Sequence, residues 1–120
     1  HIKAGSSDNA LVDFSDWLPT LAELGVGKVG HKIDGISFAP RLFGLPSNLR
    51  ESRSFAFSES KGGKAWVRTQ RYKLYNNGQL YDVQKDAMEK KSLKNVVGSL
   101  AKKRAALQAA FTKLSYSNIK

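Results

Sequence analysis

Hydrophobic and polar positions change their spacing along the chain, and each change predicts a different element. Near the N-terminus, apolar residues recur at helical spacing after Ser15 and Asp16, which can cap a first turn, and the pattern stops at Gly25. Pro19 is compatible with a helix only near its start. We therefore expect a short helix of about two to three turns, with an apolar stripe of Leu18, Leu21, Ala22 and Leu24.

Residues 25–53 show no regular period and predict an irregular loop. They hold five of the ten glycines and two of the three prolines. Their bulky side chains are too numerous for a free linker: Ile33, Ile36, Phe38, Leu42 and Phe43. We expect these side chains to pack on a core that lies partly outside this chain.

From residue 54 the pattern alternates with a period of two, which is typical of strands. Phe55 and Phe57 alternate with small polar residues, and after a turn at residues 60–63 the alternation continues through residues 65–69. A second turn is predicted at Asn77-Gly78, a pair that favours the type I′ hairpin because both central residues need positive φ. The sequence thus predicts about four antiparallel strands between residues 53 and 83.

The C-terminal part returns to helical spacing. Apolar residues recur at intervals of three, four and seven, and the stripe comprises Leu93, Val97, Leu100, Leu107, Phe111 and Leu114. Gly98 and Ser99 mark the expected start of the helix, with residues 93–97 in a separate turn. The predicted fold is α+β: a four-stranded antiparallel sheet packed by one long C-terminal helix, preceded by a short helix and a long irregular loop.

Length and composition restrict the classes of protein. A chain of 120 residues with 41% apolar content suits one core rather than two full domains. No apolar run approaches the roughly 18 residues of a membrane span, so no membrane partner is expected. Without cysteine there is no disulfide, no Cys-ligated zinc and no thiol nucleophile. The chain starts at His1 rather than Met, and we expect it to begin inside a longer protein.

The net charge of +10 lies entirely in the second half of the chain. Residues 1–60 carry 6 Lys/Arg against 7 Asp/Glu, whereas residues 61–120 carry 14 against 3. This asymmetry predicts either a polyanion partner or a solvated basic face. Single-stranded nucleic acid is not favoured, because Trp66 shares a face with Arg68 by alternation while Tyr72 and Tyr75 lie on opposite faces of their strand.

Few residues could support catalysis or hold a metal. Of the two histidines, His31 in a glycine-rich loop is either an ordinary exposed residue or a ligand. Asp82, Asp86 and Glu89 could suggest calcium, but their spacing fits no calcium loop. Capping of the next turn and pairing with nearby lysines is the favoured interpretation, with Lys85, Lys90 and Lys91 as partners. We expect no catalytic residue and no metal ligand in this chain.

Four motifs in order resemble the C-terminal part of the arylsulfatase-type sulfatases. Residues 11–25 contain D-W-L-P-T-L, and residues 32–44 read K-I-D-G-I-S-F-A-P-R-L-F-G. Residues 66–75 read W-V-R-T-Q-R-Y-K-L-Y, and residues 80–89 contain L-Y-D-V-Q-K-D followed by Glu89. The family carries D-x-x-P-T-L, D-G-x-S-x-x-P-x-L-x-G, v-R-t-x-r-Y-K-l and L-Y-D-l-x-x-D-P-x-E in this order. One departure is Ala87, where the family usually has proline.

The resemblance implies that a parent protein hydrolyses sulfate esters in an alkaline-phosphatase-like fold, using calcium and a formylglycine formed in a C/S-x-P-S-R motif. No such motif occurs here. This chain should hold no cofactor and be inactive alone, its partner being the remainder of the sulfatase. Relatives are commonly periplasmic or secreted, although the chain itself does not indicate a compartment.

The resemblance also implies a division of the chain and a substrate surface. Residues 1–52 would end the large sulfatase domain, and residues 53–120 would form its C-terminal subdomain, which borders the substrate cleft. Lys61, Lys64 and Trp66, near the first hairpin, are the candidates for contact with a sulfated anionic substrate. The alternative for these three residues is a structural role, as surface lysines and a core tryptophan. The alternative for the whole chain is a stand-alone basic module that binds sulfated polysaccharide or nucleic acid.

Overall fold

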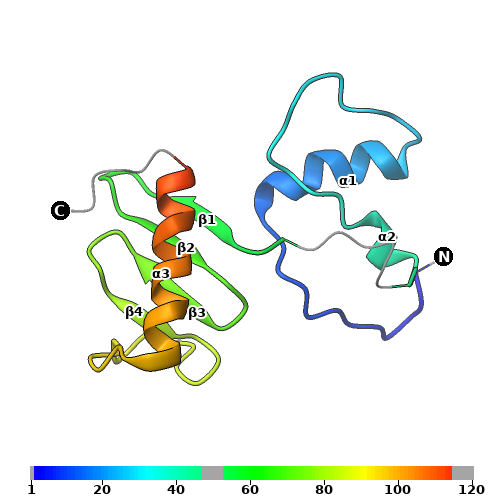
Figure 1. Ribbon diagram of the computed structural model, residues 1–120. Coiled ribbons are helices and arrows are strands. Elements are labelled where there is room, and N and C mark those ends of the chain that lie inside the picture. Colours follow the sequence, from blue (N-terminus) through cyan, green and yellow to red (C-terminus); the bar gives the residue numbers. More distant parts are fainter. Residues whose placement is uncertain (1, 47–52, 115–120) are drawn as a thin grey trace. The chain divides into compact units, whose positions relative to one another are not determined.

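The computed structural model describes residues 2–46 and 53–114, which belong to two compact units, His1–Ser54 and Phe55–Lys120 (Figure 1). Residues 47–52 of the predicted irregular loop, and the predicted boundary after residue 52, lie outside the described residues. The assignment of residues 1–52 to a larger sulfatase domain stays a prediction. Among the described residues, no helix combines the length and the apolar character that a membrane crossing requires.

The first unit contains the predicted short helix. A 3-10 turn, η1 (Phe14–Asp16), leads into α1 (Trp17–Leu24), and the loop that follows contains the single turn α2 (Ala39–Leu42). The cap differs from the prediction, because Asp13 accepts the Ser15 N–H at 3.0 Å and Asp16 accepts the Asp13 N–H at 2.8 Å. The carboxylate of Asp16 makes no cap hydrogen bond to α1, since the 3-10 turn places it toward the loop.

Asp16 and Thr20 join α1 to the loop that carries the second sulfatase-like motif. Asp16 Oδ1 accepts the backbone N–H of Ile36 at 2.7 Å, and Thr20 Oγ1 accepts that of Phe38 at 3.0 Å. The Arg53 guanidinium also donates to the Asp16 carboxylate, with Nε 2.9 Å from Oδ2. Burial alone would raise the pKa of Asp16, but the bonds from Arg53 and from backbone N–H groups outweigh burial and lower this pKa. The first two motifs are therefore one hydrogen-bonded assembly.

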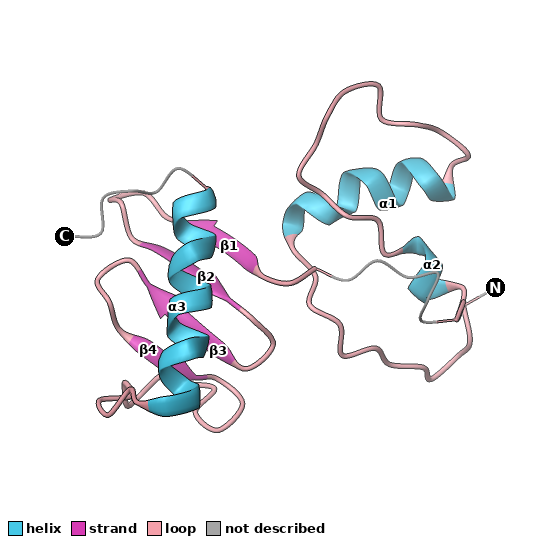
Figure 2. Ribbon diagram, in the orientation of Figure 1, coloured by secondary structure: helices cyan, strands magenta, loops and turns pink. Residues whose placement is uncertain are grey.

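The second unit is the predicted sheet and helix. The strands β1 (Ala56–Glu59), β2 (Ala65–Arg68), β3 (Tyr72–Tyr75) and β4 (Leu80–Asp82) form one antiparallel sheet in the order β1-β2-β3-β4. The helix α3 (Gly98–Lys113) lies across one face of this sheet (Figure 2). Together they bury Ala65, Val67, Leu74, Leu80, Leu107, Ala110 and Phe111. The α+β fold predicted from periodicity is confirmed.

Two local predictions in this unit need correction. Val97 is 74% exposed, because it is the extended N-cap residue of α3 and so lies outside the helical stripe; Val96 packs on the core instead. Residues 93–97 form no separate turn.

The turn between β3 and β4 is also not of type I′. Gly78 has φ of +84° while Asn77 has no positive φ, and the Gly78 N–H bonds to Tyr75 O at 2.9 Å. This is the pattern of a three-residue loop closed by a glycine.

The three carboxylates near the end of β4 fasten the following segment. Asp86 accepts a backbone N–H of the segment that follows it, as the capping prediction expected, whereas Asp82 and Glu89 form ion pairs with cations other than the predicted lysines. Asp82 Oδ2 accepts from Arg71 Nη2 at 2.8 Å, and Glu89 Oε1 accepts from Lys73 Nζ at 2.7 Å. Asp86 accepts the backbone N–H of Lys91 at 2.8 Å. Lys73 lies on β3 and Arg71 directly precedes it, so both partners come from the neighbouring strand region rather than from the adjacent lysines. The last two motifs, like the first two, are one assembly.

Gly35→Ala should destabilise the first unit, because a Cβ at residue 35 would lie 2.1 Å from the carbonyl oxygen of Ser15. We expect the free energy of opening of α1 to fall by about 1–3 kcal/mol, measured by amide hydrogen exchange. Gly30→Ala is the matched control, since no atom lies within 4 Å of its added methyl group. Equal protection of α1 in the two variants would contradict the close approach.

The stability of the second unit should depend on pH through Glu89. Burial alone would raise the pKa of Glu89, but hydrogen bonds from Lys73 and Tyr75 outweigh it and hold this pKa below its usual value of 4.5. Because the pKa is lowered on folding, the stabilisation is complete above about pH 4.5 and is lost as pH falls through the folded pKa.

We expect urea unfolding to show a smaller loss of stability on acidification for Glu89→Gln than for the unchanged chain. Asp82 and Asp86, whose pKa values are also lowered, are common to both proteins, so the difference isolates Glu89. Glu59→Gln, which removes an exposed carboxylate at the end of β1, should retain the full acid sensitivity. Identical pH profiles for Glu89→Gln and the unchanged chain would refute this assignment.

Candidate functional site

The face of the sheet opposite α3 carries the chemistry of the second unit. Val67, Leu74 and Leu80 face the helix, so alternation places their strand neighbours on the other face. In the register of the sheet, Trp66 pairs with Tyr75, and Lys73 pairs with both Arg68 and Tyr81, each within this face. Cross-strand pairing thus brings aromatic rings and cations together.

Two of the three predicted substrate residues meet on this face. The Nζ atom of Lys64 lies 4.8 Å from the centroid of the Tyr75 ring, and the Nζ atom of Lys73 lies 4.6 Å from that of Trp66 and 4.8 Å from that of Tyr75. The Tyr81 ring completes the group with an edge contact to Tyr75 at 5.8 Å. We call Lys64, Trp66, Lys73, Tyr75 and Tyr81 the aromatic–lysine cluster.

Lys61, the third predicted residue, is placed apart from this cluster. It is exposed at the tip of the β1–β2 hairpin, where Gly62 and Gly63 both adopt positive φ and Ser60 N donates to Lys64 O at 2.8 Å. The predicted turn at residues 60–63 is confirmed. Within the described residues, no hydrogen bond or ion pair fixes the Lys61 ammonium, which is therefore free to follow a ligand that approaches the hairpin.

Glu89 binds two members of the cluster and fixes their protonation states. Its two carboxylate oxygens accept from Lys73 Nζ at 2.7 Å and from the Tyr75 hydroxyl at 2.6 Å. Burial alone would lower the pKa of Lys73, but the bond to Glu89 outweighs it and raises this pKa, so Lys73 stays charged. Burial and the bond to Glu89 both raise the pKa of Tyr75, which keeps its proton. The cluster is thus suited to binding by charge and ring contact, not to proton transfer.

Lys73, Tyr75 and Glu89 were not predicted as part of this site. The sequence separates Trp66 from Tyr75 by a turn of unknown length, and only the observed register makes them neighbours. The alternation that placed Trp66 and Arg68 on one face was a usable signal. Within β3, the same alternation places Lys73 and Tyr75 on one face, but it does not show that this is the face that carries Trp66.

The carboxylates do not form a metal site. Asp82 binds Arg71, Glu89 binds Lys73 and Asp86 binds a backbone N–H, so each is directed to a different donor. No group of three or more His, Asp or Glu side chains converges within the described residues. His31 is exposed in its loop. The arrangement of these residues does not fit a calcium site.

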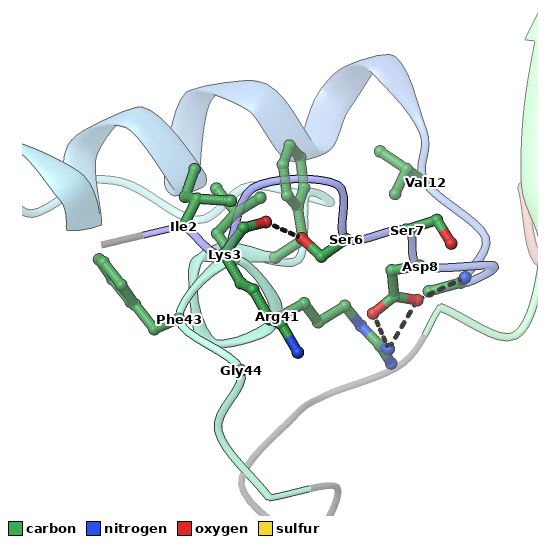
Figure 3. Close-up of a pocket in the computed structure, with 12 residues that line it drawn as sticks. Ile2, Lys3, Ser6, Ser7, Asp8, Val12, Arg41, Phe43 and Gly44 are labelled. Atoms are coloured by element: carbon green, nitrogen blue, oxygen red, sulfur yellow. Dashed lines mark hydrogen bonds and ion pairs between the residues drawn. The ribbon is translucent and has the colours of Figure 1, made fainter.

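A separate cavity of about 490 Å³ lies within the first unit (Figure 3). Ile2 and Phe43 line one part of it, and Arg41 pairs with Asp8 in another part, with Nη1 and Oδ2 3.2 Å apart. The full lining is Ile2, Lys3, Ser6, Ser7, Asp8, Ala10, Val12, Phe38, Arg41, Leu42, Phe43 and Gly44. None of the predicted substrate residues lines it, and of its charged lining residues Arg41 and Asp8 bind each other.

The comparisons with known proteins point to one class of enzyme. No protein-family model matches the chain. An ulvan-active sulfatase of Formosa agariphila is 34% identical over 83 residues, which are 63% of this chain and 16% of that sulfatase. The chain therefore spans a small part of this relative's length.

Two solved structures are similar in fold as well as in sequence. A 2-O GAG sulfatase has a TM-score of 0.62 and 34% identity, with 82% of this chain and 24% of that chain covered. A putative sulfatase from Bacteroides thetaiotaomicron has a TM-score of 0.60 at the same identity and coverage. Both matches cover a minor part of a sulfatase, which is consistent with a C-terminal region. In sequence and in fold, the chain is similar to part of a sulfatase, and the resemblance drawn from its four motifs is confirmed.

Proposed function

We propose that this chain is the C-terminal part of a sulfatase, a sulfuric ester hydrolase, which it completes without carrying the catalytic centre. The observation that carries this proposal is agreement of sequence and fold with sulfatases over a minor part of each. The names of two of these relatives specify ulvan and GAG, and we propose a sulfated polysaccharide as the substrate here too. The calcium and formylglycine that the resemblance implies would belong to the remainder of the enzyme.

The exposed apolar surface of the first unit supports a partner of this kind. Among the described residues of this unit, the buried ones are Asp16, Thr20 and Ala39, none of which has a large apolar side chain. By contrast, Phe14 is 89% exposed and Val26 96% exposed. Eight further large apolar side chains of this unit are exposed: Ile2, Val12, Trp17, Leu18, Leu21, Leu24, Phe43 and Leu45. A surface of this kind marks an interaction site, and we assign it to the large domain of the sulfatase.

The aromatic–lysine cluster supports a role at the border of the substrate cleft. Lys64 and Trp66 lie on one sheet face, and Lys61 extends from the adjacent hairpin. A sulfate group would bind to the ammonium groups, while a sugar ring would stack on the half-buried indole. Lys73 already binds Glu89 and contacts the Trp66 ring, so we assign it the role of holding the indole in place.

The sequence that precedes His1 in the full polypeptide is the most direct test of the assignment. We expect a C/S-x-P-S-R motif there together with Asp and Asn residues that can bind calcium. Their absence would refute the sulfatase proposal.

The first unit should be the less stable one when the 120-residue chain is studied alone. Its apolar surface has no cover, so we expect its backbone amides to exchange hydrogen faster than those of the β2–β3 core. At high salt, the chain should also bind a hydrophobic dye, and Phe14→Ser with Leu21→Ser should reduce the signal. Met88→Ser, which removes an exposed apolar side chain of the second unit, is the control. Uniform protection without dye binding would contradict a docking role.

In the complete sulfatase, Trp66→Ala and Lys64→Ala should impair action on the polysaccharide and spare a small sulfate ester. We expect KM for the polymer to rise about tenfold, equivalent to about 1.4 kcal/mol, because ring and charge contacts are removed while the catalytic centre is untouched. Trp66→Phe keeps a ring and should lose less. Lys28→Ala, an exposed lysine of the first unit, is the control. Equal loss on both substrates would indicate a folding defect and contradict substrate contact.

A further inference from the structure

The cations of the second unit are most concentrated between the end of β4 and the first half of α3. Residues 85–104 contain seven Lys/Arg and only two acidic residues, Asp86 and Glu89. We call this segment the basic end; its cations are Lys85, Lys90, Lys91, Lys94, Lys102, Lys103 and Arg104. Figure 1 shows the connector to α3 and the first turns of that helix at the same end of the unit. All seven side chains are exposed.

Neither acidic residue of this segment forms an ion pair with these cations. Glu89 binds Lys73 of β3 and the hydroxyl of Tyr75, and Asp86 accepts a backbone N–H. Among the described residues of the second unit, the ion pairs involve Arg71 and Lys73 only. The first turn of α3 contains no acidic residue. The positive potential of the basic end is therefore left to solvent and to ligands.

The backbone of the basic end is held firmly although its cations are exposed. The Leu93 N–H donates to Leu80 O at 2.8 Å, which pins the connector to β4. Leu93, Val96 and Leu100 pack against the core. Lys94 lies between these anchors in sequence, and the other lysines of the basic end precede or follow them. Arg104 Nη2 lies 3.4 Å from Gly78 O in the β3–β4 turn. Because this backbone is already ordered, binding of a ligand would cost little additional backbone entropy.

The amino-acid composition of the basic end favours one class of polyanion over another. Residues 85–104 contain no aromatic residue on which a nucleic-acid base could stack. Six of the seven cations are lysines, which act as separate point charges rather than as bidentate forks. We propose that the basic end is a second binding surface, additional to the aromatic–lysine cluster, for a sulfated polysaccharide chain. The choice of a sulfated polysaccharide rests on the proposed function. The binding surface itself is inferred from the charge and the position of the exposed cations.

Binding of heparin to the full 120-residue chain, measured by calorimetry over a series of salt concentrations, tests this surface. Lys102→Gln with Lys103→Gln should weaken binding about tenfold and lower the slope of log Kd against log salt by about one per lysine. Lys90→Gln with Lys94→Gln should act in the same way. Lys28→Gln with Lys32→Gln removes the same charge from exposed lysines of the first unit and should change Kd less than about twofold. Circular dichroism checks that each variant is folded.

The outcomes separate this proposal from its alternatives. Equal weakening by the control pair and the basic-end pairs would overturn it, because attraction would then follow net charge alone. Tighter binding of duplex DNA, or equal binding of unsulfated polygalacturonate, would overturn the choice of sulfated polysaccharide. The measurement needs no enzymatic activity, so a negative result leaves the proposed sulfatase role standing. Absence of the upstream sulfatase motif would refute that role without changing the heparin result.

Discussion

In each unit, a carboxylate binds donors from a distant part of the sequence, and the local architecture depends on that contact. Asp16 receives the N–H of Ile36 and the guanidinium of Arg53, and Glu89 receives Lys73 and the Tyr75 hydroxyl. Burial disfavours the charged form of both, yet both pKa values are lowered because the donors outweigh burial. Loss of the cationic donor, Arg53 or Lys73, would leave a partly buried charge without its ion-pair partner, which costs more than the bond itself contributes.

The two units differ in what surrounds these carboxylates. In the second unit, Leu74, Leu107 and Phe111 form an apolar core between sheet and helix, so that the Glu89 contacts add to an already packed structure. Among the described residues of the first unit, the buried ones are Asp16, Thr20 and Ala39, and the large apolar side chains are half-buried or exposed. Hydrogen bonds alone contribute little net stability. The first unit therefore depends more on an external cover than the second does.

The sequence predicted those features that local periodicity determines. The sheet, the short helix and the start of α3 at Gly98 follow from spacing and turn residues, because every residue of those patterns lies near its neighbours in the chain. Periodicity could not say that Val96 rather than Val97 packs inward, since that depends on where the extended N-cap ends. It also could not predict the Asn77-Gly78 turn geometry, in which Gly78 alone takes positive φ.

The ion-pair and ring partners that lie far apart in the sequence could not be predicted, for a different reason. The carboxylates near β4 have several lysines adjacent in sequence, and these were the natural candidates for ion pairs. Lys73 and Arg71 bind them instead. Lys73 is held in β3 and largely buried, whereas an exposed lysine must lose conformational freedom to pair; Arg71 directly precedes β3, and the pairing of β3 with β4 brings it beside Asp82. The same register brings Trp66 beside Tyr75, a contact that no spacing within either strand encodes.

This choice of partners also explains the surface charge. Because Asp82 binds Arg71, which precedes β3, and Glu89 binds Lys73 of β3, neither carboxylate pairs with the lysines that follow it in sequence. Asp86 accepts a neutral backbone N–H and forms no ion pair, although its charge still offsets part of the positive charge around it. With seven cations and two carboxylates in residues 85–104, the segment stays strongly positive. The bonds that hold the fold together thus produce an unneutralised basic surface at one end of the second unit. A charge that the fold itself leaves uncompensated, on a backbone anchored by Leu93 and Arg104, is the physical basis on which a polyanion could bind there.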